Sequence, residues 1–308
     1  MILVWGALDD PPVERVLESL AARTAEVVHL DDHSLGGLRY DIRLGPRPRG
    51  WIEVEGRRIE VDELSGMYLR PGEQQGPAAA ASATMLAVAG SVAATVVNRP
   101  AAGRSNLSKP FQLAVLADAG LPTPETLVTS DADAARAFLG RHGRIVYKSI
   151  SGRRSIVASV GIDEIERLDQ VGHGPVQLQR WVEGIDVRVH VVGDRWFATS
   201  VASTATDYRY AGEQGLAVAL APFDLPDELG RHLVEVTAAM GLAVAGVDLR
   251  RTPDGGWCCF EVNPSPGFPY YEDHTGQPIA AAIADLLTTS PRRADRSVSR
   301  RGRAAPGA

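Results

Sequence analysis

The residues best suited to chemistry lie toward the C-terminal end, in the segment GVDLRRTPDGGWCCFEVNPSPG (246–267). This pattern predicts two strands joined by a turn at Asp254-Gly255. A turn centred there places Asp248 opposite Glu261, whereas a turn one residue later places Asp248 opposite Asn263. In both registers the three side chains share one face, because side chains alternate with a period of two. Two carboxylates and an amide oxygen suit Mg²⁺ that is held mainly by phosphates.

The facing carboxylates require a nearby cation, because like charges opposite each other on paired strands repel. The first register also places Arg250 opposite Cys259. An ordinary surface hairpin would pair the acids with Arg250 or Arg251, and the spacing alone leaves that alternative open. The turn NPSPG (263–267), with two prolines and one glycine, favours a binding site, because such stiffness has more use there than on a free surface.

Two lysines stand out by their rarity. Thirty of the 32 basic residues are arginine, and only Lys109 and Lys148 are lysine. Lys109 precedes an expected helix and Lys148 ends an expected strand. A compact ammonium on a flexible stem suits a phosphate oxygen, and two such groups beside a carboxylate–metal site are what nucleoside triphosphate chemistry needs. The sequence contains neither GxxxxGK[ST] nor GxGxxG, so neither a P-loop nor a classical dinucleotide site is indicated.

The elements that must position these residues follow from hydrophobic periodicity and turn residues. Hairpins are expected over 51–61, with a turn at Glu55-Gly56, and around Gly193-Asp194 and Asp254-Gly255. A helix over 130–142 is expected to have Ser130 as its cap. The other expected strands span 1–8, 26–30, 66–71, 94–100, 125–129, 144–150 and 176–182. The other expected helices span 13–23, 78–94, 110–119, 226–240 and 277–287.

Net charge, apolar segments and cysteine content exclude several classes of protein. The net charge is −6, which gives no indication of nucleic-acid binding. The N-terminal apolar run is too short for a membrane span and lacks the flanks of a signal peptide, so we expect no membrane association. Only Cys258 and Cys259 are cysteine, and two adjacent cysteines make neither a disulfide framework nor a zinc site. We therefore expect a cytoplasmic protein. Residues 290–308 are predicted to be a disordered basic tail.

Taken together, these parts occur in a recognisable order. Lys109, Lys148, QLQRWVEGIDVRV (177–189) and GVDL…FEVNPSPG (246–267) follow one another as they do in ATP-grasp ligases, which the chain resembles over residues 98–288. Within that superfamily it is most similar to the ribosomal-protein glutamate ligases and to the microviridin-type (graspetide) peptide ligases. The resemblance implies an α/β (α+β) protein, with an N-terminal α/β pre-ATP-grasp domain (1–100) followed by an ATP-grasp domain (101–289) of two α+β subdomains.

The resemblance also implies a role for each matching residue. The two lysines would contact the ATP phosphates, a hinge strand would bind adenine through its backbone, and one acidic residue would contact ribose or substrate. Arg188, in an Asp-x-Arg match, and Arg209 would act on the acyl phosphate or the substrate carboxylate. In the loop after the second lysine, Arg153 or Arg154 would supply charge where relatives often have glycines. The implied contacts to ATP are Lys109, Lys148, Gln179, Arg180, Trp181, Val182 and Asp186. The implied Mg²⁺ ligands are Asp248, Glu261 and Asn263.

The activity that follows from this resemblance is an ATP-dependent ligation of a carboxylate to an amine or hydroxyl through an acyl phosphate. The substrates would be ATP with Mg²⁺, for which Mn²⁺ could substitute, and a peptide. Two alternatives stay open: a glutamate-type amino-acid ligase acting on a small molecule, and a non-catalytic ATP-binding regulatory protein. The resemblance is also compatible with a homo-oligomer.

Overall fold

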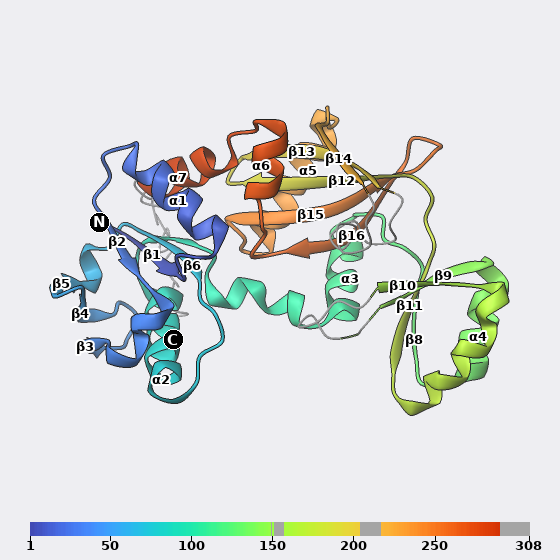
Figure 1. Ribbon diagram of the computed structural model, residues 1–308, viewed down its shortest axis with the longest axis horizontal. Helices are drawn as coiled ribbons and strands as arrows, with labels where there is room; N and C mark the ends of the chain where they lie inside the picture. The colour runs from blue at the N-terminus through green and yellow to red at the C-terminus, as the bar shows by residue number, and fades with distance from the viewer. Residues whose placement is uncertain (149, 151–156, 204–216, 290–308) are drawn as a thin grey trace, which may run out of the picture.

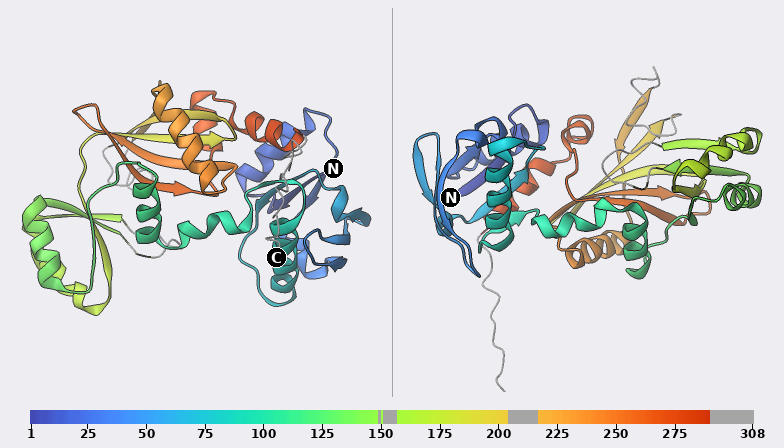
Figure 2. Two further views of the ribbon diagram at one scale, coloured as in Figure 1. Left: turned by 180° about the vertical axis from the view of Figure 1, so that it is seen from behind. Right: turned by 90° about the horizontal axis from the view of Figure 1, so that it is seen from below.

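A computed structural model describes residues 1–148, 150, 157–203 and 217–289. Within these ranges the chain forms an N-terminal parallel sheet with a small sheet beside it, a five-stranded antiparallel sheet and a four-stranded antiparallel sheet. The five-stranded sheet lies between the other two regions (Figures 1 and 2). This mixed α/β architecture confirms the expected fold class. None of the helices in the described ranges has the length and apolar character needed to cross a bilayer.

The N-terminal sheet is parallel and is covered by helices on both faces. Its elements are β1 (Ile2–Gly6), α1 (Pro11–Ala21), β2 (Val27–Leu30), β6 (Gly66–Arg70), α2 (Gly76–Ser91), β7 (Thr95–Val97) and the C-terminal helix α7 (Ile279–Thr288). The strand order is β2-β1-β6-β7. Leu3 and Trp5 pack on the side of α2, whereas Ile2 and Val4 pack on the side of α1 and α7. Alternate side chains of β1 therefore pack into two apolar layers, one on each face of the sheet.

A three-stranded antiparallel sheet extends this region. It consists of β3 (Arg39–Arg43), β4 (Arg49–Val54) and β5 (Arg57–Glu60), flanked by the short 3-10 helices η1 (Asp32–Gly37) and η2 (Val61–Glu63). The predicted turn at Glu55 and Gly56 is confirmed. Both residues have positive φ, 52° and 75°, as a tight two-residue hairpin turn requires. The strand β3 was not predicted.

Within the described ranges, the helices that cover the four-stranded sheet lie on one of its faces. Its elements are β8 (Thr126–Thr129), α4 (Ala132–His142), β9 (Arg144–Lys148), β10 (Val157–Gly161), η4 (Ile162–His173) and β11 (Val176–Arg180), with strand order β10-β9-β11-β8. Ile145 and Leu178 point to the helical side, where they pack with Phe138 and Leu139. The opposite face of these strands carries the candidate residues Lys148 and Gln179.

The start of α4 corrects one prediction. The cap is Asp131, whose carboxylate accepts a hydrogen bond from the backbone N–H of Asp133 at 2.8 Å. The expected cap, Ser130, lies one residue too early. Serine and aspartate both cap helices well, so the sequence pattern predicted the helix correctly but not which of the two residues caps it.

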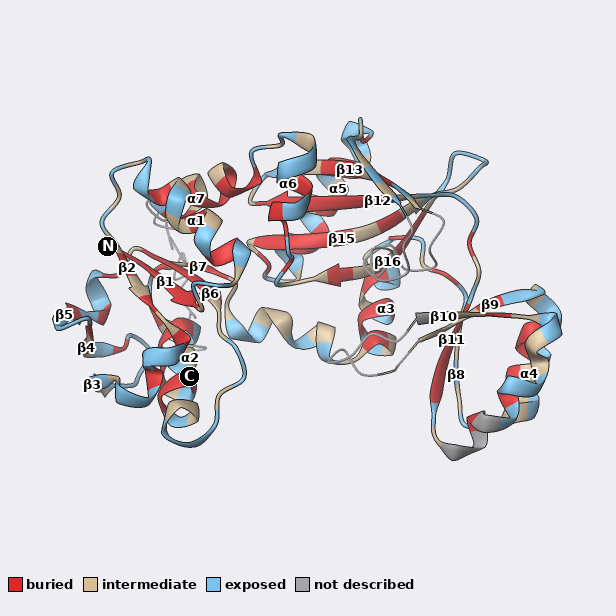
Figure 3. Cartoon of the chain, viewed as in Figure 1, coloured by how far each residue is buried: buried red, intermediate tan, exposed pale blue. Residues whose placement is uncertain are grey.

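The five-stranded sheet carries most of the candidate residues. Its elements, with the segment leading into it, are η3 (Pro100–Leu107), α3 (Lys109–Asp118), β12 (Ile185–Val192), β13 (Arg195–Ser203), β14 (Val218–Pro222), α5 (Asp227–Ala239), β15 (Val244–Arg251), β16 (Trp257–Asn263) and α6 (Pro269–Thr275). The order is β14-β13-β12-β15-β16. Its central strands are largely buried (Figure 3). Val247 and Leu249 pack with Leu116 of α3 and Leu233 of α5.

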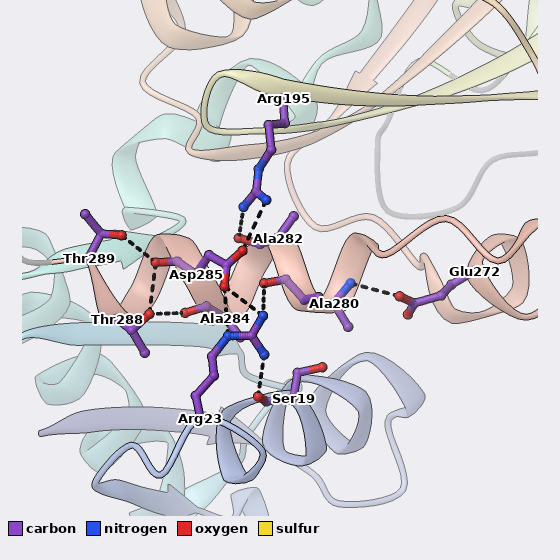
Figure 4. A network of polar contacts seen from close by, with 11 residues as sticks. Ser19, Arg23, Arg195, Glu272, Ala280, Ala282, Ala284, Asp285, Thr288 and Thr289 are labelled. Atoms are coloured by element: carbon purple, nitrogen blue, oxygen red, sulfur yellow. Dashed lines mark hydrogen bonds and ion pairs between the residues drawn. The ribbon is translucent and has the colours of Figure 1, made fainter.

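Helix α7 joins the N-terminal sheet to the five-stranded sheet (Figure 4). Asp285 of α7 accepts hydrogen bonds from Arg23 Nε at 2.8 Å and from Arg195 Nη1 at 3.1 Å. The same guanidinium groups donate to the carbonyls of Ala281 and Ala282. One carboxylate therefore links the segment after α1 to the β12–β13 hairpin.

This link predicts a pH-dependent contribution to stability. Burial opposes ionisation of Asp285, but hydrogen bonds from Arg23 and Arg195 outweigh it and lower its pKa. We expect Asp285→Asn to reduce the free energy of unfolding at pH 7 by about 1 kcal/mol, a small value because the carboxylate is partly exposed. The contribution is complete above the pKa of an unfolded aspartate, about 3.9, and is lost as the pH falls through the lower folded pKa.

Urea unfolding of both proteins from pH 7 to pH 3 measures this effect. The matched control is Asp227→Asn on α5, whose carboxylate is exposed and lies 3.9 Å from Arg231. The control should change stability little, as exposed pairs do. A difference between wild type and Asp285→Asn that persists unchanged to pH 3 would contradict the proposed ionic origin.

Candidate functional site

The two carboxylates face each other as the first of the two registers predicts. Asp248 on β15 pairs with Glu261 on β16, and Asn263 lies opposite Gly246. The backs of the strands are apolar, as expected, with Val247 and Val262 fully buried. Asp248, Glu261 and Asn263 are half-buried. The structure thus brings the three candidate metal ligands to one face of this hairpin.

A β-bulge corrects the rest of the predicted register. The pairing shifts between Asp248 and Leu249, so Leu249 pairs with Cys259 and Arg250 with Cys258. The expected pairing of Arg250 with Cys259 was wrong, because the bulge inserts Phe260 as an extra residue. A bulge breaks strict alternation and re-aims side chains next to functional sites. No simple count from the turn could have located it.

Each carboxylate has a cation from another element. Arg188 Nη1 on β12 donates to Asp248 Oδ1 at 2.7 Å, and Lys109 Nζ on α3 lies 3.6 Å from Glu261 Oε2. Arg188 and Lys109 are 6% and 8% exposed, so water screens these charges weakly. The alternative that the acids pair with Arg250 or Arg251 does not hold, because neither forms an ion pair with them within the described part of the chain. The repulsion expected from sequence is relieved by distant residues.

Gly246 makes room for Arg188. A Cβ atom at this position would lie 2.0 Å from Arg188 Nη2 and 2.8 Å from Pro266 Cβ. His190, two residues along β12, is buried, and its Nε2 lies 3.4 Å from the carbonyl oxygen of Gly267. Burial and the charge of Arg188 lower the His190 pKa well below its usual value. The imidazole is therefore neutral beside the guanidinium.

A glutamine that the sequence did not single out fixes the position of Lys109. Gln112 lies one turn further along α3 and is buried. Its side chain donates to the carbonyl of Val262 at 2.8 Å and accepts from the Val262 N–H at 3.0 Å. These bonds take the place of a further strand at the edge of β16. The helix that begins with Lys109 is thereby held against the strand that carries Glu261.

Lys148 lies where cationic side chains gather. It ends β9 and pairs with Gln177 of β11. Its Nζ is 5.2 Å from the centroid of the Phe260 ring. Burial raises the pKa of the Cys258 thiol to about 11, although the charges of Arg180, Arg250 and Lys148 act in the opposite direction. Lys148 and Arg250 both approach the Phe260 ring, and positive charge gathered in this way suits an anion such as a polyphosphate.

The predicted hinge lies at the end of β11, where the chain crosses toward β12. Gln179 is buried and donates through Nε2 to Thr126 Oγ1 at 3.1 Å. The centroid of the Trp181 ring lies 3.6 Å from the Arg144 guanidinium carbon, and Trp181 Nε1 donates a hydrogen bond to the Glu183 carboxylate. Arg180, at the strand end, is exposed.

Arg250 organises the start of β12 and was not predicted to do so. Its Nε and Nη2 donate to the two carboxylate oxygens of Asp186 at 2.8 and 2.9 Å, and its Nη1 donates to the carbonyl of Val182 at 2.7 Å. Asp186, the expected ribose or substrate contact, is thus held by a bidentate ion pair. Three further candidates, Arg153, Arg154 and Arg209, lie outside the described residues.

The donor set fits a divalent cation that is bound together with phosphates. Asp248 and Glu261 supply two hard oxygen ligands, and the Asn263 amide oxygen, which accepts from the Ser265 N–H at 2.9 Å, retains a second lone pair. Mg²⁺ usually binds one or two carboxylates and takes its other ligands from water and substrate phosphates. Before a cation binds, Arg188 neutralises the Asp248 carboxylate and Lys109 neutralises the Glu261 carboxylate.

Comparison with known proteins identifies the family of this chain. A model of the RimK-like ATP-grasp domain matches residues 106–287. Beta-citrylglutamate synthase B of Danio rerio is 28% identical over 217 residues, which are 66% of this chain and 53% of that protein. A probable alpha-L-glutamate ligase of Haemophilus influenzae is 28% identical over 185 residues, 57% of this chain and 60% of that protein. The chain thus spans little more than half the length of these curated relatives.

Solved structures match nearly the whole chain. The ATP-grasp ligase PsnB, complexed with minimal precursor, Mg and ADP, is 28% identical, with a TM-score of 0.77 and coverage of 93% of this chain and 96% of that one. The macrocyclase MdnC from Microcystis aeruginosa, bound with precursor peptide MdnA, has a TM-score of 0.74 at 21% identity and covers 94% of this chain and 100% of its own. The latter shows a shared fold. With the domain match over more than half of its length, the chain belongs to the RimK-like ATP-grasp family.

Proposed function

We propose that this protein is an ATP-dependent ligase that joins a carboxylate to an amine or hydroxyl of a peptide through an acyl phosphate. The observation that carries the proposal is the facing pair Asp248 and Glu261, each neutralised by a buried cation from another element. A surface hairpin has no need of such an arrangement. A site that must hold Mg²⁺ and polyphosphate does, because both signs of charge have to be fixed before the ligands arrive.

The proposed reaction has two steps. A substrate carboxylate oxygen attacks the γ-phosphorus of ATP, the bond to ADP breaks, and an acyl phosphate forms. The amine or hydroxyl then attacks the acyl carbon, inorganic phosphate leaves, and the nucleophile gives up its proton. The protein contributes position and charge stabilisation, with no covalent bond to the enzyme.

Each group of site residues has a proposed part in these steps. Lys109 and Lys148 hold the phosphates, and residues 179–182 and Asp186 surround the nucleoside. Arg188 and Arg209 stabilise the acyl phosphate or bind the substrate carboxylate. Mg²⁺, when bound by Asp248, Glu261 and Asn263, neutralises charge on the transferred phosphoryl group. We place the pre-ATP-grasp domain at 1–100 and the ATP-grasp domain at 101–289.

The choice of a peptide substrate rests on the solved relatives. PsnB, at 27 to 28% identity over almost the whole chain, was solved with minimal precursor and with precursor peptide PsnA2, whereas the named glutamate ligases match a shorter part of this chain. An amino-acid ligase acting on a small molecule is the second candidate, because the sequence relatives are named as a beta-citrylglutamate synthase and a probable alpha-L-glutamate ligase. A cytoplasmic location and self-association remain predictions from the sequence.

Incubation with ATP, Mg²⁺ and a peptide encoded beside the gene should produce peptide lighter by one water molecule per bond, as measured by mass spectrometry. Glu261→Gln keeps the size of the side chain but removes its charge, and we expect it to abolish the product because a metal-binding carboxylate is lost. ADP release stimulated by single amino acids, with all neighbouring peptides unmodified, would favour the small-molecule ligase. Tight ATP binding without any turnover would favour a regulatory protein.

A second prediction concerns the space that Gly246 leaves for Arg188. Gly246→Ala should displace the guanidinium from Asp248 and slow peptide-dependent ADP formation by about a hundredfold, as expected for a misplaced active-site group. Steady-state kinetics with ADP detection measures the change. The matched control is Gly90→Ala in α2, where an added Cβ meets nothing within 4 Å. If Gly246→Ala has the same kinetic constants as wild type, Arg188 does not have the proposed catalytic role.

A further inference from the structure

Arg70 connects the N-terminal sheet to the turn that follows the candidate metal ligands. It is the last residue of β6, and its guanidinium is bound by the Asp10 carboxylate. Its Nη1 also donates to Ser265 Oγ at 2.8 Å and to the Pro266 carbonyl at 3.2 Å. The Arg70 side chain is 16% exposed. A largely buried guanidinium thus binds one side chain of its own region and two groups of a turn almost two hundred residues away.

Asn98 reaches the same turn from the neighbouring strand. It follows β7, and its Nδ2 donates to the carbonyls of Val244 and Pro264 at 2.6 and 2.5 Å. Its Oδ1 accepts from the N–H groups of Ala243 and Val244. Two strands of the N-terminal sheet therefore end in side chains that bind backbone at the start of β15 and just after β16.

A cavity of about 310 Å³ lies at this junction, lined in part by Asp10, Arg70, Asn98, Arg99 and Ser265. The carboxyl ends of parallel strands are where α/β sheets commonly bind ligands. Here, however, the donors of Arg70 and Asn98 are already used, and Arg99 donates to three carbonyls around the end of α2. The polar groups are satisfied by protein, which favours a clamp over a ligand pocket.

The clamped turn also contacts Asn263, the third candidate metal ligand. The Ser265 N–H donates to Asn263 Oδ1 at 2.9 Å. A hydrogen bond from the backbone of the clamped residue therefore orients the amide whose oxygen is the third candidate ligand. Partners of this kind orient metal ligands, and their removal typically weakens metal binding by 10- to 100-fold.

We propose that Arg70 is a positioning residue for the Mg²⁺ site: by fixing Ser265 and Pro266, it sets the orientation of Asn263 from the N-terminal sheet. The inference rests on the proposed function, because it needs Asn263 to be a metal ligand. Its consequence is that the N-terminal region takes part in metal binding without contacting the metal.

The test uses Mn²⁺ as the probe. Electron paramagnetic resonance measures free Mn²⁺ in the presence of ADP, and calorimetry measures ADP affinity without metal. We expect Arg70→Ala to weaken Mn²⁺ binding by about tenfold or more and to leave metal-free ADP affinity unchanged. Arg15→Ala is the matched control, because Arg15 joins α1 to Asp273 of α6 without contacting the turn. It should leave both affinities unchanged.

A second, less disruptive variant distinguishes a loss of metal binding from a loss of folding. Ser265→Ala removes only the hydroxyl that Arg70 contacts, so it should weaken Mn²⁺ binding in the wild-type background and have no further effect in Arg70→Ala. Additive effects, or unchanged Mn²⁺ affinity in folded Arg70→Ala, would overturn the role of Arg70 while leaving the proposed ATP site intact. A wild-type protein that binds no Mn²⁺ with ADP would overturn the proposed function, and this inference with it.

Discussion

The repulsion between two carboxylates on paired strands is the constraint on which the site depends. Asp248 and Glu261 face each other on β15 and β16, and such a pair is unfavourable unless positive charge is close. The protein supplies that charge from two directions, with Arg188 from the adjacent strand and Lys109 from a helix outside the sheet. Because both cations are buried, their positions must be fixed by the fold.

Several local features become intelligible as ways of fixing those positions. Gly246 leaves the space that Arg188 occupies, and Gln112 holds α3 against the edge of β16. The bulge after Asp248 departs from strict alternation where the site needs it. Arg250 uses its donors on Asp186 and Val182 and so stays away from the acidic pair. The acidic pair and Asp186 in this way have separate cationic partners.

The sequence predicted the hairpins and the shared face of the acids, because both depend on local turn chemistry and on a period of two. It could not predict the bulge, since Phe260 looks like any apolar strand residue. It also gave no signal for Gln112 or Asp285, whose partners lie far away along the chain. Strands β3, β10 and β14, each at the edge of its sheet, were also missed. The family resemblance supplied roles that spacing alone could not assign.

Calorimetric binding of ATP, with and without Mg²⁺, to wild type and to Lys148→Ala decides whether this site binds nucleotide phosphates. We expect wild type to bind ATP more tightly with Mg²⁺. We also expect loss of the Lys148 ammonium to weaken binding by about tenfold or more, the usual effect of removing a hydrogen bond to a charged group. Equal affinity of the two proteins, or a wild type that binds no ATP, would contradict the assignment of this site to nucleotide phosphates.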